Sequence, residues 1–174
     1  MLSSVLSSPS VAAALSDRGA DATYASGSVR EAAGVLSFVY KAAAEIGELG
    51  DNTASMRAEI ASDDLLRQAL TGPDAEVLVL GHTRWASVGI ISEPNAHPQC
   101  SDELGGSSGP FVTGVLNGDV DNYADLTASE SLRIASEITS DAKVIPTLVS
   151  RRLAAGDEAV DAFRQSVRRF DGSV

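Results

Sequence analysis

Three short stretches of this chain carry side chains that could bind an amino acid and support an attack on it. Arg84 follows an apolar run in "GHTRWASVG", Asn117 and Gly118 form an Asn-Gly pair, and Asp141 precedes an apolar segment. A guanidinium binds a carboxylate through two parallel hydrogen bonds, and a carboxylate can hold an ammonium group. An asparagine amide beside a glycine N–H can stabilise a developing oxyanion. Together these groups would suit an α-amino acid whose amide or acyl group is attacked.

Each of these residues, taken singly, also has an ordinary structural explanation. Arg84 could pair with one of the many acidic side chains, and Asn-Gly is the commonest turn dipeptide. The helix dipole favours an acid in the first turn of a helix, which would explain Asp141. Trp85 and the two histidines, His82 and His97, could be packing residues. Only the combination points to an amino-acid site.

Hydrophobic periodicity predicts the elements that lead to Arg84. Apolar residues at helical spacing indicate a helix over residues 28–50, with a capping box at its start. A weaker helix is expected from about residue 53 to residue 70. The run "EVLVLG", residues 76–81, is typical of a short buried strand. This strand would deliver Arg84 to its edge.

The second half of the chain predicts strands followed by helices. Residues 110–126 read as a strand with an Asn-Gly turn, and residues 132–139 could form another strand. Residues 141–153 predict a helix, in which Pro146 indicates either a kink or a late start. A last amphipathic helix is expected over residues 157–168. The pattern as a whole indicates an α+β fold.

Composition narrows the possible partners and the compartment. The chain has 174 residues, a formal net charge of -11, a mean hydropathy of +0.04 and one cysteine. The acidic balance argues against a nucleic-acid partner, and no apolar run reaches the roughly 18 residues of a membrane span. A lone cysteine forms no internal disulfide, so we expect a cytoplasmic protein. Two histidines and one cysteine in separate contexts predict no metal site, and no cofactor is expected.

The end of the sequence looks interrupted. The last residues, "RRFDGSV", read as a helix end, a turn and the first residues of a strand. We therefore expect a fragment that is incomplete at both ends.

The same motifs resemble a known family. "HTRWASVG", "NAHP", "NGDVDNY" and "SDAKVI" resemble, in order and spacing, the glutaminase domain of glucosamine-6-phosphate synthases, the isomerising glutamine:fructose-6-phosphate amidotransferases of class II. The family patterns are His-Thr-Arg-Trp-Ala-Thr-His-Gly, Asn-Ala-His-Pro, His-Asn-Gly and Thr-Asp-Thr-Glu-Val. The resemblance spans residues 77–174, which we expect to be the amidotransferase core. Residues 1–76 would be a divergent helical segment of the same domain.

This resemblance implies an Ntn-hydrolase fold, an αββα sandwich of two antiparallel sheets between helices. Arg84 would hold the α-carboxylate of glutamine and Asp141 its α-amino group. Asn117 and the N–H of Gly118 would form the oxyanion hole.

Two further positions match the family near its ligand. Trp85 would lie beside the ammonia tunnel. Ser87 would keep the hydroxyl that the family has near bound glutamine.

Departures from the family pattern concern catalysis. The family uses an N-terminal cysteine whose own amine acts as general base, whereas this sequence starts with Met1 and Leu2. Cys100 lies in a loop without an α-amine and is interpreted as an incidental thiol. Val88 and Leu116 replace two histidines of the pattern. We therefore expect this chain by itself to be inactive.

The resemblance implies a glutamine-hydrolysing amidotransferase that supplies ammonia to fructose 6-phosphate, giving glucosamine 6-phosphate. Its partners would be L-glutamine and a sugar phosphate bound by sugar-isomerase domains that are not among these residues. The complete protein would be a homo-oligomer. The alternatives are a glutamine-binding module without catalysis and a helical interaction domain.

Overall fold

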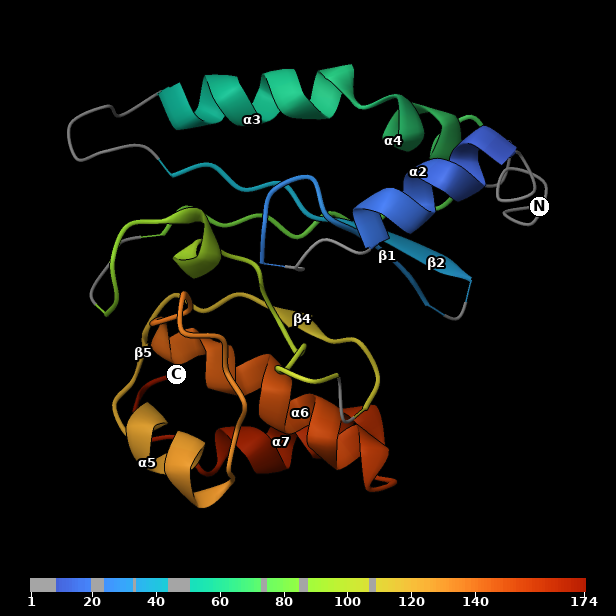
Figure 1. Ribbon diagram of the computed structural model, residues 1–174. Helices are drawn as coiled ribbons and strands as arrows, with labels where there is room; N and C mark the ends of the chain where they lie inside the picture. The colour runs from blue at the N-terminus through green and yellow to red at the C-terminus, as the bar shows by residue number, and fades with distance from the viewer. Residues whose placement is uncertain are drawn as a thin grey trace. The chain divides into compact units, whose positions relative to one another are not determined.

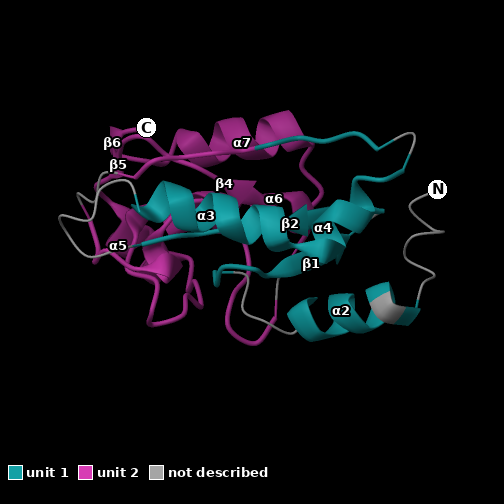
Figure 2. Cartoon of the chain, turned by 90° about the horizontal axis from the view of Figure 1, so that it is seen from above, with its two compact units in different colours: residues 1–79 teal, residues 80–174 magenta. Residues whose placement is uncertain are grey.

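The structure is a computed structural model that describes residues 9–19, 24–32, 34–43, 51–72, 75–84, 88–106 and 109–174. Figure 1 shows helices together with short antiparallel strands, which confirms the α+β class. The chain divides into two compact units, residues 1–79 and residues 80–174, which are coloured separately in Figure 2. None of the described helices is both long enough and apolar enough to cross a membrane.

Unit 1 packs helices and a hairpin around a small core. Its elements are α2 (Pro9–Gly19), β1 (Val29–Ala32), β2 (Val35–Phe38), α3 (Asp51–Ser62) and α4 (Asp64–Ala69). Val11, Val29 and Leu65 are buried together, and Leu36 and Phe38 pack against them. The core therefore joins α2, both strands and α4.

The helix predicted over residues 28–50 is wrong. Residues 29–38 form an antiparallel hairpin in which Val29 pairs with Phe38 and Ala32 with Val35, and residues 44–50 lie outside the described residues. Gly34 has φ +79, a left-handed conformation that interrupts a helix and reverses the chain. Burial of Val29 in the core of unit 1 outweighs the helical propensity of the alanines.

The segment before Arg84 also differs from its prediction. Helices α3 and α4 confirm the helical region near residues 53–70, with a break at Asp63. The strand predicted over residues 76–81 is wrong, because no described strand pairs with it. Its side chains are exposed, Leu78 to 96%. An apolar run forms a stable strand only beside a hydrogen-bonding neighbour.

Unit 2 is built around one central helix, α6 (Val144–Ala154), whose residues 144–150 are all buried. Its other elements are η1 (Glu93–Asn95), β3 (Gln99–Cys100), β4 (Thr113–Gly114), β5 (Asp119–Val120), α5 (Tyr123–Ser129), η2 (Asp141–Lys143), α7 (Ala159–Val167) and β6 (Gly172–Ser173). β3 pairs with β4, and β5 pairs with β6, both antiparallel. The main core consists of Val120, Leu126, Leu132, Val144, Ile145 and Leu148.

Two of the predicted helices of unit 2 are confirmed, but α5 was not predicted. The strand expected over residues 110–126 is confirmed only at β4 and β5, and it is wrong for residues 123–126, which form the first turn of α5. Pro146 lies in the first turn of α6, which confirms the late start, and α7 matches the last predicted helix. The strand predicted over residues 132–139 is wrong. The backbone of Arg133 makes its hydrogen bonds to groups outside any strand: its N–H donates to Glu103 Oε1 at 2.8 Å, and its oxygen accepts from Leu104 N at 2.7 Å.

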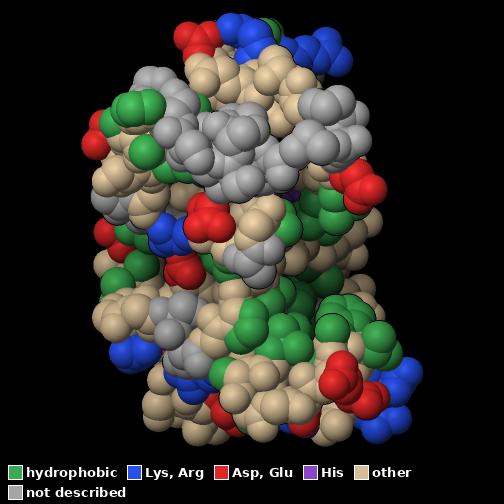
Figure 3. All heavy atoms as spheres, turned by 90° about the vertical axis from the view of Figure 1, so that its right-hand side faces the viewer, with side chains coloured by type: hydrophobic (Ala, Val, Ile, Leu, Met, Phe, Trp, Pro, Cys, Tyr) green, Lys and Arg blue, Asp and Glu red, His purple; other side chains and the backbone are tan. Residues whose placement is uncertain are grey.

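Surface hydrophobic groups occur in both units. Figure 3 shows one face on which hydrophobic side chains lie between acidic and basic ones. The exposed residues of α7 include Val160 and Phe163, which are 66% and 55% exposed. Single exposed apolar residues of this kind are common on soluble domains.

Candidate functional site

Arg84 is half-buried and is bound by backbone groups that follow it in the chain. Its guanidinium donates to the carbonyl oxygen of Val88 and, at 3.5 Å, to that of Ile90. Burial lowers the pKa of Arg84, and the negative charge of Asp141 acts in the opposite direction. An arginine keeps its proton at neutral pH in any case, so the site holds a fixed positive charge. Its acceptors are neutral carbonyls, which a ligand carboxylate could replace.

Asp141 is buried at the start of η2. The residue is 5% exposed, and its Oδ2 accepts a hydrogen bond from the backbone N–H of Val120 at 2.7 Å. This bond fastens η2 to β5, the strand that begins directly after Gly118. Asp141 and Arg84 interact electrostatically without forming a direct ion pair. The structure therefore brings Arg84, Asp141 and the Asn117–Gly118 turn into one region of unit 2.

The Asn117–Gly118 turn lies at the edge of the β5–β6 ladder. Asn117 is exposed, and Gly118 is half-buried. A Cβ atom at Gly118 would overlap the backbone oxygen of Ser173 in β6. The close approach of β6 thus requires glycine at this position. The exposed amide of Asn117 is free to face a ligand.

The remaining two predicted site residues cannot be placed. Trp85 and Ser87 lie outside the described residues.

The sequence analysis missed the central role of Asn95. Asn95 is fully buried, and its Oδ1 accepts hydrogen bonds from the backbone N–H groups of Thr139 at 2.7 Å and Ser140 at 2.8 Å. These residues immediately precede Asp141. The position of Asn95 in a proline-containing turn could have indicated this role, because an asparagine amide can bind two backbone groups of another loop.

The two histidines contact each other. The rings of His82 and His97 have centroids 4.3 Å apart and are tilted by 50°. His97 is buried in the loop that contains Asn95. This contact joins the segment before Arg84 to that loop.

Cys100 is buried beside a buried lysine. The Nζ of Lys143 donates to the backbone oxygen of Cys100 and, at 2.6 Å, to that of Asp102, and it lies 4.0 Å from the Cys100 thiol. Burial lowers the pKa of Lys143, and the neighbouring acidic groups raise it. The lysine therefore ties together the chain around β3. Within the part of the chain that the structure describes, no three His, Cys, Asp or Glu side chains are grouped to hold a metal ion.

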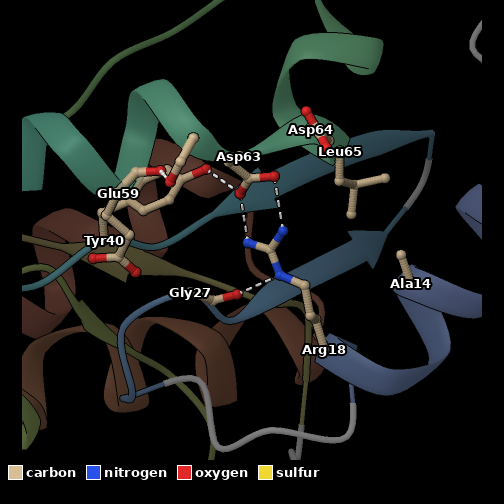
Figure 4. Close-up of a pocket in the computed structure, with 9 residues that line it drawn as sticks. Ala14, Arg18, Gly27, Tyr40, Glu59, Asp63, Asp64 and Leu65 are labelled. Atoms are coloured by element: carbon tan, nitrogen blue, oxygen red, sulfur yellow. Dashed lines mark hydrogen bonds and ion pairs between the residues drawn. The ribbon is translucent and has the colours of Figure 1, made fainter.

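Unit 1 has a pocket of about 380 Å³ that contains none of the predicted site residues. Arg18 forms two contacts with the carboxylate of Asp63, at 2.9 and 2.8 Å, and the hydroxyl of Tyr40 donates to the same carboxylate at 2.6 Å (Figure 4). Arg18 also donates to Gly27 O at 2.6 Å. The charges of this cluster are satisfied internally, which indicates a structural role.

The Asp63 carboxyl titrates far below its ordinary range. Burial alone would raise its pKa, but the hydrogen bonds from Arg18, Tyr40 and the N–H of Leu66 lower it to about 2. Burial and the negative charge of Asp63 raise the pKa of Tyr40. The cluster therefore stays a carboxylate, a guanidinium and a neutral phenol across the neutral range.

Comparison with known proteins agrees with the motifs. The chain is 37% identical over 131 residues to the isomerising glutamine–fructose-6-phosphate aminotransferase of Mesorhizobium japonicum, a match that covers 74% of this chain and 19% of the relative. The enzymes of the same name from Geobacillus kaustophilus and Sulfolobus acidocaldarius are 34% and 27% identical, over 75% and 74% of this chain. The chain is homologous to these aminotransferases. The family resemblance of the motifs is thereby confirmed.

The homologous region is a small part of each relative. The chain spans about a fifth of the length of the curated aminotransferases that it matches. No family profile matches the chain, and no solved structure matches it significantly.

Proposed function

We propose that unit 2 binds L-glutamine as part of the glutaminase domain of an isomerising glutamine–fructose-6-phosphate aminotransferase. The observation that carries this proposal is the bond between Asp141 and the backbone of Val120, together with the coupling of Asp141 to Arg84. It sets a carboxylate and a guanidinium near an Asn-Gly turn, as an amino-acid ligand requires. The names of the relatives support glutamine as that ligand.

Each group has a distinct role in this proposal. The guanidinium of Arg84 would exchange its neutral acceptors, Val88 O and Ile90 O, for the α-carboxylate of glutamine. Asp141 has one oxygen bound to Val120 N, and its other oxygen would accept from the α-ammonium group. Asn117 and Gly118 would receive the side-chain amide. In this proposal Trp85 would lie beside the ammonia path and Ser87 near the bound glutamine.

The proposed chemistry is acyl transfer. In the complete protein, the thiol of an N-terminal cysteine would pass its proton to the cysteine's own amine and attack the glutamine amide. The oxyanion would be held at Asn117 and Gly118, and the amine would return the proton to the departing ammonia. The glutamyl thioester is then hydrolysed to glutamate, and in the complete protein the ammonia passes to fructose 6-phosphate. The antiparallel ladders β3–β4 and β5–β6 are compatible with the two sheets of an Ntn-hydrolase sandwich. We further propose that the complete protein is a cytoplasmic homo-oligomer.

Cys100 does not fit the role of the nucleophile. It is 3% exposed, and Lys143 binds its backbone oxygen and that of Asp102. An attacking thiol needs access to the amide carbon and a nearby proton acceptor. We therefore propose that this chain binds L-glutamine without hydrolysing it by itself, which favours the binding-module alternative for the isolated chain.

Isothermal titration calorimetry of the 174-residue chain with L-glutamine tests the proposal. We expect saturable binding that Arg84→Ala weakens by about 1.5–3 kcal/mol, or roughly tenfold to a hundredfold, because a charge-assisted pair is lost. Arg84→Lys keeps the charge without the planar fork and should recover only part of the affinity. Arg57→Ala removes an exposed arginine of unit 1 and is the matched control. Absence of heat at millimolar L-glutamine would refute the proposal.

A further inference from the structure

Asn95 makes a complete set of hydrogen bonds between two loops. Its Oδ1 accepts from the N–H groups of Thr139 and Ser140, at 2.7 and 2.8 Å. Its Nδ2 donates to Ser92 Oγ at 2.9 Å and to Glu137 O at 3.4 Å. The amide is fully buried. Such a buried, satisfied amide fixes the relative position of the segments that it joins.

The segment held by Asn95 leads directly into Asp141. Ser140 is buried and extended, with φ -74 and ψ 131, and η2 begins at the next residue. Two adjacent backbone N–H groups bound to one oxygen leave the chain little freedom at this point. Asn95 therefore restrains the backbone that leads into Asp141. The hydrogen bond from Val120 N restrains the side chain of Asp141.

The described part of the Arg84 loop, residues 88–90, rests on the same segment. A Cβ at Gly89, which has φ +82, would lie only 2.7 Å from Thr139 Oγ1, so this loop packs tightly on Thr139. Ile90 N lies 3.4 Å from the same hydroxyl, and the carbonyl of Ile90 accepts from Arg84. Asn95 thus anchors a segment to which both the Arg84 loop and Asp141 are attached.

We propose that Asn95 is a positioning residue that sets the separation and orientation of Arg84 and Asp141, and so selects ligands with an α-carboxylate and an α-ammonium group. This inference rests on the proposed glutamine site. Asn95 acts through Thr139 and Ser140 and does not touch the ligand. Its effect on binding must therefore pass through Asp141 and through the residues around Ile90 that accept from Arg84.

Three variants separate positioning from general stability. Asn95→Ala removes every hydrogen bond of the side-chain amide, including a weaker one from Thr139 Oγ1 at 3.4 Å, whereas Asn95→Asp keeps an oxygen acceptor for Thr139 and Ser140. Gln99→Ala is the control for a disturbance of the Asn95 loop itself, because Gln99 is also a buried amide but donates to Pro94 O and Ala96 O, on either side of Asn95, and not to the Thr139–Ser140 segment. A merely structural role predicts similar consequences for Asn95→Ala and Gln99→Ala.

The first readout needs no ligand. Hydrogen exchange of the full 174-residue chain, followed by NMR, reports the protection of the Val120 amide, which is bound by Asp141. Asn95→Ala should speed this exchange about tenfold or more, while Asn95→Asp and Gln99→Ala leave it within about threefold of the wild-type rate. Unchanged protection of Val120 in folded Asn95→Ala would overturn the inference.

The second readout is calorimetry with L-glutamine in a double-mutant cycle. Asn95→Ala should weaken binding about tenfold, and Asn95→Asp by less than about threefold. In an Asp141→Asn background, Asn95→Ala should cause a smaller further loss than in the wild type, because the part of its effect that passes through the missing carboxylate is gone. Additive losses would overturn the inference.

The outcomes also separate this inference from the proposed function. A wild-type chain that binds no L-glutamine refutes the proposed function and, with it, the role in ligand selection. Wild-type binding with equal affinity in Asn95→Ala refutes only the role of Asn95. If Asn95→Ala does not fold, Asn95→Asp decides: retained affinity supports the inference, and a tenfold loss overturns it.

Discussion

Replacing Asp141 by asparagine separates its structural bond from its charge. The Oδ1 atom of an asparagine can still accept from Val120 N, so the link between η2 and β5 can persist. The buried carboxylate has no direct cationic partner at Arg84, so its removal also relieves a desolvation cost. We therefore expect the free energy of unfolding to change by less than about 1 kcal/mol.

The same substitution should strongly weaken ligand binding. A hydrogen bond between an ammonium group and a carboxylate contributes about 1.5–3 kcal/mol, of which the neutral amide retains little. At about 1.4 kcal/mol per tenfold, the Kd for L-glutamine should rise roughly tenfold to a hundredfold. Calorimetric titration measures the Kd, and urea denaturation of the same samples measures the stability.

A matched control is the residue that follows β5 in the chain. Asp121 is exposed, so Asp121→Asn removes the same charge from the chain without touching the Asp141–Val120 bond. We expect this variant to bind L-glutamine as the wild type does. Equal losses of affinity in both variants would show that long-range charge explains the effect. If Asp141→Asn lowered the stability while its folded fraction bound L-glutamine with wild-type affinity, Asp141 would be only structural.

Three further predictions concern stability. The folded-state pKa of Asp63 is about 2, below its ordinary 3.8, so its carboxylate should stabilise unit 1 above pH 4 by about 2 kcal/mol. This stabilisation should be lost as the pH falls from about 4 to 2, and Asp63→Asn should remove that acid dependence in circular-dichroism melts. Gly118→Ala should displace β6, because its Cβ would meet Ser173, and raise hydrogen exchange at the β5–β6 ladder at a cost of about 1–3 kcal/mol. Glu103→Gln should lower the free energy of unfolding in urea by about 3 kcal/mol, because Glu103 is buried and accepts two hydrogen bonds from Arg151, at 3.0 and 2.7 Å. A decrease below about 1 kcal/mol would show that the pair contributes little.

The sequence predicted α6 and α7 well because local signals agree with packing there, whereas α5 was read as the end of a strand. α6 begins late, as Pro146 requires, and α7 is amphipathic in sequence and packs against α6. The hairpin at residues 29–38 was missed because its spacing of apolar residues also fits a helix, and only the burial of Val29 against α2 and α4 decides between them. α2 was overlooked although Pro9 at its start and Arg18 in its last turn are ordinary helix signals.

The residues of the candidate site were chosen from motifs, and their roles stay predictions, whereas the connections between them could not be chosen in this way. Arg84 and Asp141 could be chosen from motifs, since a guanidinium and a carboxylate suit the two ends of an amino acid. Their coupling depends on a bond from Asp141 to a backbone group 21 residues away and on the burial of Asn95. Such contacts between distant segments follow from tertiary packing, which periodicity and motifs do not report.

Chemical-shift mapping of L-glutamine on the isotope-labelled chain tests the central claim most directly, because it reports where the ligand binds. The proposed site predicts saturable shifts concentrated at the amides of Gly118, Val120 and Ala142 and at the side-chain Nε of Arg84, with unit 1 unaffected. Shifts confined to the Arg18–Tyr40–Asp63 pocket, or none at millimolar L-glutamine, would contradict it.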